Sequence, residues 1–262
     1  MRIAIVGQGY VGLPLAIAAA DLQEEGLSAS RIKKCLLVLQ MVMNEAVNSE
    51  RISRNPLGKG KLEKPSLPKS IPAAFTLNEI KQLSQSMPVP YQLLTEFLCF
   101  TGLRMGEVVS LRVKNLDLQS GLLTVETSAV YLGGKLYTTS PKSGHSRRVP
   151  LSQHLIGKLQ SHVKNKSDES FVFSSPVGEQ LDADQYRRTF KRKVREMGKP
   201  TMTPHNCRDT AASLAIRAGA SVKTVAQMLG HADASITLTR YTAFFPDDFD
   251  SLRLALGKIS GR

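Results

Sequence analysis

The chain has 262 residues, enough for one large domain or two small ones with a buried core. Lys and Arg outnumber Asp and Glu by 35 to 22, so the formal net charge is +13 and a polyanionic partner is expected. The three cysteines, Cys35, Cys99 and Cys207, lack any paired spacing, which excludes a disulfide framework and a zinc site and indicates reduced thiols inside a cell.

Residues 1–26 are predicted to form a separate head. Their first part reads MRIAIVGQGYVGLPLAIAAAD, which predicts a strand, a turn containing Gly7, Gly9 and Gly12, and a helix. This stretch resembles the start of the NAD-binding domain of nucleotide-sugar (UDP-glucose type) dehydrogenases. A dinucleotide site also needs a second parallel strand that ends in an acidic residue about twenty positions on, whereas a helix start follows here at residues 27–30. We therefore expect an orphan strand, turn and helix without a bound cofactor.

The apolar run in the head has other interpretations. Its glycines and Pro14 interrupt it, and Arg2 is its only positive charge, which argues against a secretory signal. No run in the chain is long enough to span a bilayer. Our hypothesis is a fused remnant, in which a dehydrogenase start has replaced the beginning of an unrelated helical domain.

Residues 27–54 predict one helix. Ser28 is a suitable N-cap, and apolar residues then recur at helical spacing. They are Ile32, Leu36, Leu39, Met43 and Ala46. Residues 55–75 predict a linker, because four prolines prevent regular structure. Its lysines, among them Lys59 and Lys61, either follow a phosphate backbone or form a solvated tether.

Residues 76–262 are predicted to form the main domain. Thr76 and Glu79 make a capping box for a first helix, and a second helix at about residues 91–100 ends at Gly102. Arg104 begins the next turn. Glu107 lies three residues later and either holds Arg104 through a charge-assisted pair or faces solvent.

Alternating residues predict a small antiparallel sheet. Residues 116–118 and 122–127 form a hairpin, and a third strand is expected near residues 147–151. Lys142 precedes this third strand beside a flexible tip, where a lysine is ordinarily a surface residue. Residues 130–137 form a hairpin extension that the pattern does not assign. A helix at residues 155–163 and a short strand at 171–173 follow.

A helix predicted at residues 184–197 is strongly basic. Such a helix either lies along a DNA backbone or presents a solvated charged face, and its one-sided charge favours DNA. The DNA-binding candidates on it are Arg187, Arg188, Lys191, Arg192 and Lys193.

Residues 201–244 concentrate the reactive side chains. Thr203 and Pro204 start a helix that places His205 and Arg208 on one face, beside an N-terminus that favours anions. A second helix begins near Ser221 and is ended by Gly230. His231 follows directly, and a third short helix from about Asp233 carries Tyr241 near its end.

This set of residues fits attack on a phosphodiester. A phenol can act as the nucleophile, while guanidinium and imidazole donors neutralise the charge that builds on the phosphate oxygens. Each residue alone is more often a core or capping residue. Their joint occurrence with the upstream Arg104 favours the chemical interpretation.

Four sequence boxes carry a specific resemblance. They are TGLRMGEVVSL around Arg104, PKSGHSRRVPL around Lys142, TPHNCRDTAASL around His205 and Arg208, and LGHADASITLTRYTAF around His231 and Tyr241. Over about residues 27–262 the chain resembles the tyrosine recombinases of the phage integrase family. The resemblance implies a mainly helical α+β catalytic domain with a small antiparallel β-sheet, at residues 76–262. Residues 27–54 then correspond to a truncated helical domain that clamps DNA.

The resemblance also implies a role for each catalytic candidate. Tyr241 attacks the scissile phosphate and forms a 3′-phosphotyrosyl link, while Arg104 and Arg208 clamp the phosphate and His231 donates to it. His205 is expected to accept the phenolic proton and Lys142 to protonate the leaving 5′ oxygen, although the sequence does not separate acid from base. Neither metal, ATP nor another cofactor is expected.

Other expectations concern partners. Double-stranded DNA is the expected substrate, bound by a homotetramer in the cytoplasm at the nucleoid, with no membrane. Residues 249–256 either dock on a neighbouring subunit or pack on their own domain. The alternative functions are a DNA-binding remnant without strand exchange and, with less support, a fragment of an NAD-dependent dehydrogenase.

Overall fold

A computed structural model describes residues 26–57, 72–132, 135–139, 146–175 and 178–244. The chain divides into two compact units, Met1–Ser70 and Ile71–Arg262. None of the helices in the described part combines the length and the apolar composition that crossing a bilayer requires. Several predictions concern residues outside the described ranges: Gly7, Gly9, Gly12, Lys59, Lys61, Lys142 and residues 249–256.

The first unit contains the predicted helix, α2 (Ala29–Asn48), and the Ser28 hydroxyl accepts from the N–H of Arg31 as expected of an N-cap. Four neighbouring apolar side chains on this helix are 56–62% exposed: Leu37, Val38, Met41 and Val42. The start of the predicted linker packs on this unit, because Asn55 bonds to Asn44 and Leu57 is buried.

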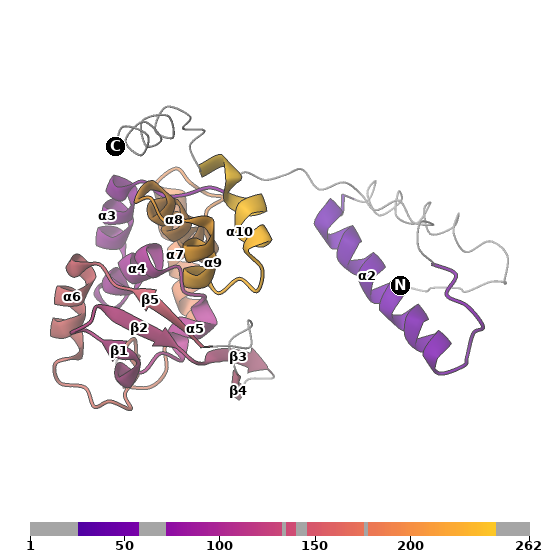
Figure 1. The fold of residues 1–262 in the computed structure, drawn as a ribbon, viewed down its shortest axis with the longest axis horizontal. Helices are drawn as coiled ribbons and strands as arrows, with labels where there is room; N and C mark the ends of the chain where they lie inside the picture. Colours follow the sequence, from indigo (N-terminus) through magenta and orange to yellow (C-terminus); the bar gives the residue numbers. More distant parts are fainter. Residues whose placement is uncertain (1–25, 58–71, 133–134, 140–145, 176–177, 245–262) are drawn as a thin grey trace, which may run out of the picture. The chain divides into compact units, whose positions relative to one another are not determined.

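The second unit is mainly helical (Figure 1). Its helices are α3 (Leu77–Ser86), α4 (Val89–Thr101), α5 (Met105–Val109), α6 (Gln153–Val163), α7 (Ala183–Glu196), α8 (Pro204–Arg217), α9 (Val222–Leu229) and α10 (Ala234–Tyr241). Short 3₁₀ turns occur at Val113–Asn115 and Thr242–Phe244.

Local signals set most of these helix ends. The Thr76–Glu79 capping box is present at α3, and Gly102 and Gly230 end α4 and α9 in the left-handed conformation, with φ of 66° and 68°. At α8 Thr203 is the N-cap and Pro204 the first helical residue, as predicted. The Thr203 hydroxyl donates to the side-chain oxygen of Asn206 at 3.0 Å.

The sheet is small and antiparallel. The strands β1 (Leu116–Asp117), β2 (Leu122–Val125) and β5 (Arg147–Pro150) lie in the order β1-β2-β5, with Leu123 opposite Val149. The unassigned extension is a separate two-stranded ribbon, β3 (Ser128–Leu132) and β4 (Lys135–Thr139). The strand predicted at residues 171–173 is wrong, because Phe171 makes only an isolated bridge to Arg112.

The core of the second unit positions α8. Helix α4 packs on α8, and buried rings from α4, α7 and the 171–173 segment fill the space around them, including Phe97, Phe173, Tyr186 and Phe190. Phe75, at the end of the predicted linker, packs on Phe190 and donates its N–H to Thr210 of α8. In Figure 1, α8, α9 and α10 lie together beside the sheet, and α9 contacts β5.

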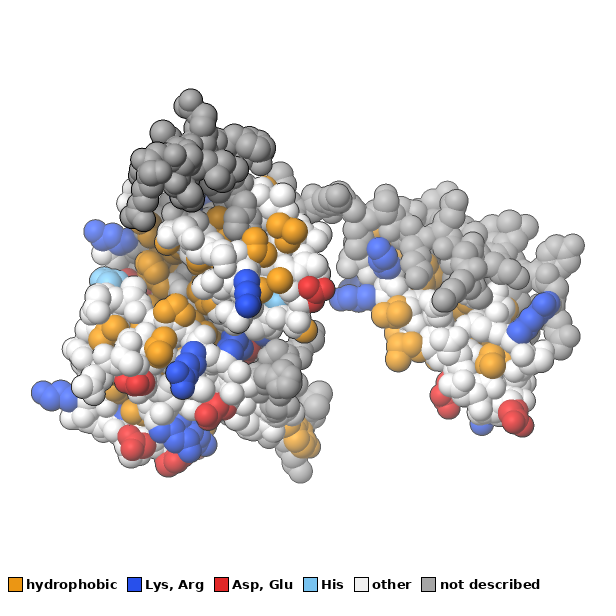
Figure 2. Space-filling model, viewed as in Figure 1, with side chains coloured by type: hydrophobic (Ala, Val, Ile, Leu, Met, Phe, Trp, Pro, Cys, Tyr) orange, Lys and Arg blue, Asp and Glu red, His pale blue; other side chains and the backbone are white. Residues whose placement is uncertain are grey.

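Charges of both signs are interspersed with apolar side chains on the face of the second unit seen in Figure 2. The net positive charge of the chain is therefore not gathered into one patch on that face.

Candidate functional site

Arg208 is the most deeply placed guanidinium of the site. It lies on the second turn of α8 with an exposed fraction of 3%. Its Nη1 donates to the carbonyl of Gly102 at 2.8 Å, and its Nη2 donates to the carbonyl of Leu229 at 2.5 Å. Burial, followed by the neighbouring Arg104, lowers the pKa of Arg208 to about 10, so the group remains charged at neutral pH.

Glu107 connects two further guanidiniums. Its buried carboxylate accepts from Arg104 Nη1 at 3.0 Å and from the Arg104 backbone N–H at 2.8 Å, which confirms the predicted pair. Arg147, at the start of β5, donates to both oxygens of the same carboxylate at 2.9 and 2.7 Å. Burial disfavours the charged form of Glu107, but the hydrogen bonds and charges of Arg147 and Arg104 outweigh it and lower its pKa.

The C-terminal end of α9 brings these three arginines together. Three successive carbonyls there each accept from a different guanidinium. Met228 accepts from Arg147 Nε at 2.9 Å, Leu229 from Arg208, and Gly230 from Arg104 Nη2 at 3.4 Å. Carbonyls at a helix end lack intrahelical partners and carry the negative end of the helix dipole, so they favour cations.

His231 follows this helix end and is half-buried. Its Nδ1 lies 2.7 Å from the hydroxyl of the buried Thr237, and its ring stacks with that of Tyr241 at 6.4 Å between centroids. Burial and the surrounding guanidiniums, Arg208 first, lower the pKa of His231 to about 4. The ring is therefore neutral at pH 7. When Thr237 donates to Nδ1, Nε2 carries the proton and can donate to an anion.

Tyr241 is the last residue of α10 and has no exposed surface. Its hydroxyl donates to Asp209 Oδ1 at 2.9 Å. Arg240 donates to both oxygens of Asp209, from Nε and Nη2, at 3.0 Å each. Burial, followed by the charge of Asp209, raises the pKa of Tyr241 to about 12.

His205 lies at the surface on the first turn of α8. Partial desolvation lowers its pKa; Asp209 opposes this shift, and Arg240 and Arg208 add to it. The ring is therefore predominantly neutral at pH 7 and can accept a proton.

The structure brings most of the predicted site residues into one region. These are Arg104, Glu107, His205, Arg208, His231 and Tyr241. Four guanidiniums (of residues 104, 147, 208 and 240) face two carboxylates (of residues 107 and 209), so the region has a net charge of +2 with both imidazoles neutral. A site with surplus cations and neutral donors favours a phosphate-like anion.

The basic residues of α7 are not part of this region. Three of them form ion pairs within the helix: Arg187 with Asp184, and Arg192 and Lys193 with Glu196. Arg188 and Lys191 are exposed, and the ion pairs of the described residues do not include them. The apolar face of α7 packs in the core, so the charged face points outward.

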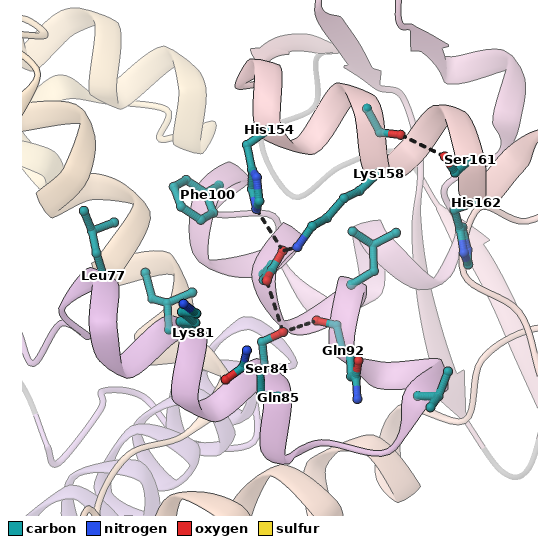
Figure 3. A pocket seen from close by; sticks show the side chains of 15 residues that line it. Leu77, Lys81, Ser84, Gln85, Gln92, Phe100, His154, Lys158, Ser161 and His162 are labelled. Carbon is teal, nitrogen blue, oxygen red and sulfur yellow. Dashed lines mark hydrogen bonds and ion pairs between the residues drawn. The ribbon is translucent and has the colours of Figure 1, made fainter.

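A groove of about 880 Å³ lies elsewhere on the second unit, between α3, α4 and α6 (Figure 3). Glu96 on its wall accepts from Lys158 Nζ at 2.6 Å and from Ser84 Oγ at 3.3 Å, with His154 Nε2 at 3.5 Å. The groove holds none of the predicted catalytic residues. Among the described residues, no three His, Cys, Asp or Glu side chains come together as a candidate metal site.

Comparison with known proteins decides the family. Residues 73–247 match the Phage integrase family. The chain belongs to this family of tyrosine recombinases. The integrase of Mycobacterium phage L5 is 29% identical over 202 residues, which are 74% of this chain and 54% of that protein. A XerC-like tyrosine recombinase of Caldanaerobacter subterraneus is 28% identical over 254 residues, which are 86% of this chain and 65% of that protein.

A solved structure of the Tn1549 transposon integrase in complex with a circular intermediate DNA has the same fold. It aligns with a TM-score of 0.73 at 23% identity and covers 93% of this chain and 84% of that one. The recombinase fold expected for the main domain is therefore confirmed. The chain spans between about half and two thirds of the length of the two relatives above.

Three residues of the site were not predicted from the sequence: Arg147, Asp209 and Arg240. Each lies inside a box that was recognised, and two of them are next to a predicted catalytic residue. Asp209 had the clearest signal, because a carboxylate in the otherwise small and apolar run after Arg208 needs a buried partner.

Proposed function

We propose that this recombinase-family chain cuts and rejoins DNA at specific sites through a 3′-phosphotyrosyl intermediate. The observation that best supports this is the meeting of one phenol, Tyr241, with the guanidiniums of Arg104 and Arg208 and two neutral imidazoles. The start of α5 contributes Arg104, and the stretch from α8 to α10, about a hundred residues later, contributes the other groups. Chance packing of a core tyrosine does not require surplus cations around it.

The arginines bind the scissile phosphate. Arg104 and Arg208 donate to its non-bridging oxygens, and His231 donates to the same oxygens from Nε2. These donors are fixed by backbone carbonyls and Glu107 before DNA arrives, so little reorganisation is needed as negative charge builds in the transition state. Loss of one such donor in other enzymes costs on the order of 10²–10³ in rate.

The bond exchange is balanced within the site. The Oη–P bond forms as the P–O5′ bond breaks, His205 takes the phenolic proton, and the leaving 5′ oxygen receives a proton from Lys142. Rejoining reverses these steps with a different 5′ hydroxyl. The phosphotyrosyl ester retains the energy of the broken phosphodiester, so the exchange needs neither ATP nor a metal.

The partner is double-stranded DNA, held by the main domain together with the shorter helical unit that contains α2. Recombination joins two duplexes, and we propose a homotetramer on them in the cytoplasm, at the nucleoid. The lysines Lys59 and Lys61 and the basic face of α7 supply further phosphate contacts. The dehydrogenase-like head contributes no cofactor, and titration with NAD is expected to give no saturable binding.

A nicked suicide substrate tests the proposal. The full chain is expected to form a covalent protein–DNA adduct, because the 5′ fragment diffuses away after cleavage and rejoining stops. Tyr241→Phe should abolish the adduct while duplex binding persists. Tyr137→Phe, which alters an exposed tyrosine of β4, is the matched control and should leave the adduct unchanged.

The competing function is a DNA-binding remnant. The burial of Tyr241 favours it, because a hydroxyl without exposed surface does not reach a phosphate. DNA binding without any adduct, both in this chain and in a version with a complete helical domain, would establish the remnant and reject the enzyme.

A further inference from the structure

Tyr241 cannot attack a phosphate from the position it occupies. Its side chain has no exposed surface, and the reactive hydroxyl donates its hydrogen to Asp209. That hydrogen bond stabilises the neutral phenol, and the carboxylate charge opposes formation of the phenolate that attack requires. A restraint on the nucleophile is therefore built into α8, one residue after Arg208.

Asp209 is unusual because a carboxylate is seldom buried so completely. Its side chain is 1% exposed, and a buried carboxylate is costly unless it stays paired and hydrogen-bonded. Arg240 supplies that pairing with two hydrogen bonds of 3.0 Å, one to each oxygen. The guanidinium also lies over the Tyr241 ring, 5.8 Å from its centroid.

Arg240 makes release of the tyrosine possible. Arg240 binds both oxygens of Asp209. The buried carboxylate therefore keeps a charged partner when the Tyr241 hydroxyl leaves. The Arg240 side chain is 39% exposed and belongs to the same helix as the tyrosine, so it can remain in place through a side-chain rotation of its neighbour.

On this basis, and resting on the proposed function, we propose that Asp209 and Arg240 are positioning residues that form a catch for the nucleophile. Asp209 holds Tyr241 as a buried neutral phenol in the absence of DNA, and Arg240 keeps the carboxylate paired when the tyrosine turns to the phosphate. The catch separates DNA binding from cleavage. The Tyr241 hydroxyl leaves Asp209 only after a phosphate has bound to Arg104 and Arg208.

The two catch residues have opposite charges and therefore opposite effects on the pKa of the Tyr241 phenol. The charged groups that face it are Asp209 and Arg208 of α8 and Arg240 of α10, and the ring of His231 stacks with it. Among these, Asp209 raises the pKa of Tyr241 and Arg240 lowers it. If these two side chains served only in packing, replacing them would not shift the pKa of Tyr241 in opposite directions.

The test uses Asp209→Asn and Arg240→Gln in the full chain. Ultraviolet difference titration against Tyr241→Phe should show a lowered pKa of Tyr241 in the first variant and a raised one in the second. At neutral pH on the nicked substrate, Asp209→Asn should form adduct faster and Arg240→Gln more slowly. Each unit of pKa change alters the phenolate fraction about tenfold, which sets the upper size of the effect.

Two results would overturn the catch: shifts of the Tyr241 pKa in the same direction, or slower adduct formation by Asp209→Asn, as expected if Asp209 were the base. The wild-type chain provides a check that is independent of variant folding. Nitration without DNA should modify the exposed Tyr137 at least tenfold faster than Tyr241, and equal rates would reject the catch. Titration and nitration do not depend on DNA cleavage. If the chain forms no adduct, the proposed function is rejected, and these two measurements still test the catch.

Discussion

Glu107 shows how one residue can organise a site. Its carboxylate, buried between α5 and β5, fixes Arg104 directly and is itself held by Arg147. Because Arg147 also bonds to the end of α9, Arg147 links β5 to the segment before His231. Arg147 therefore positions Arg104, the proposed phosphate ligand, through Glu107.

We expect Arg147→Met to lower the free energy of unfolding by about 3 kcal/mol, because it leaves the buried Glu107 with one cation instead of two. Urea denaturation measures the change. Lys114→Met is the matched control: it removes an exposed pair with Glu169 and should cost less than about 1 kcal/mol.

A double variant separates pairing from packing. Adding Glu107→Gln to Arg147→Met removes the stranded charge and should recover part of the stability. If the two changes are simply additive, Arg147 contributes packing alone and its proposed link to Arg104 is wrong.

His231 gives a pH-dependent prediction. Its pKa in the folded protein, about 4, lies below the ordinary value of 6.5, so on acidification the unfolded state binds the proton first. The stability that the folded protein gains from keeping His231 neutral is complete above pH 6.5 and is lost as the pH falls towards 4. The full shift corresponds to about 3 kcal/mol, and because the ring is only half-buried we expect the folded state to lose about 2 kcal/mol relative to His231→Gln between these pH values. Unfolding curves of both proteins with the same pH slope would contradict this.

Residues whose chemistry is uncommon were predictable from the sequence, whereas residues whose role depends on a partner were not. Tyr241, Arg208 and His231 stand in recognisable boxes. The roles of Asp209 and Arg240 depend on hydrogen bonds between α8 and α10, which neither stretch encodes alone. Burial of Tyr241 was likewise not expected from a helix-end position.

At the scale of elements, helix ends were the most predictable features because their signals are local. Ser28, Thr76 and Gly230 act within one turn of the residues that they cap. The ribbon of β3 and β4 was not assigned, since its position depends on a tertiary contact with α5. The strand predicted around Phe171 is absent for a similar reason, because the backbone of Phe171 pairs only with Arg112 in an isolated bridge.

Gly106 is the point where β3 comes closest to α5. A Cβ there would lie 2.5 Å from the carbonyl oxygen of Ala129 and 2.8 Å from the hydroxyl of Ser128. We expect Gly106→Ala to displace the ribbon and destabilise the unit by about 2 kcal/mol.

Gly157 in α6 is the matched control, because a Cβ there meets nothing within 4 Å. Its replacement by alanine should raise stability by about 0.5–1 kcal/mol through helix propensity alone. Thermal unfolding compares the two. Similar small gains in both variants would show that the approach of β3 is not tight.

At the scale of the whole molecule, the net charge of +13 predicts salt-sensitive DNA binding. The outward face of α7 can contribute, and Arg188 and Lys191 are its best candidates because the helix's own carboxylates pair with other residues. We expect Arg188→Gln and Lys191→Gln each to weaken binding and to reduce the slope of log K against log salt by about 0.9.

Fluorescence anisotropy with a labelled duplex over a range of salt concentrations measures this slope. Lys114→Gln provides the comparison, since it removes the same charge from an ion-paired surface position. An unchanged slope in both α7 variants would remove this helix from the DNA-binding surface.

The meeting of three guanidiniums at the end of α9 has an evolutionary consequence. Their acceptors are main-chain oxygens of residues 228–230, which every amino acid possesses, so codon changes at positions 228 and 229 leave the anchoring atoms in place. Only position 230 is constrained by its backbone angle. The side chains at these two positions can thus change during evolution, within the limits of core volume, while the carbonyls that hold the three guanidiniums remain.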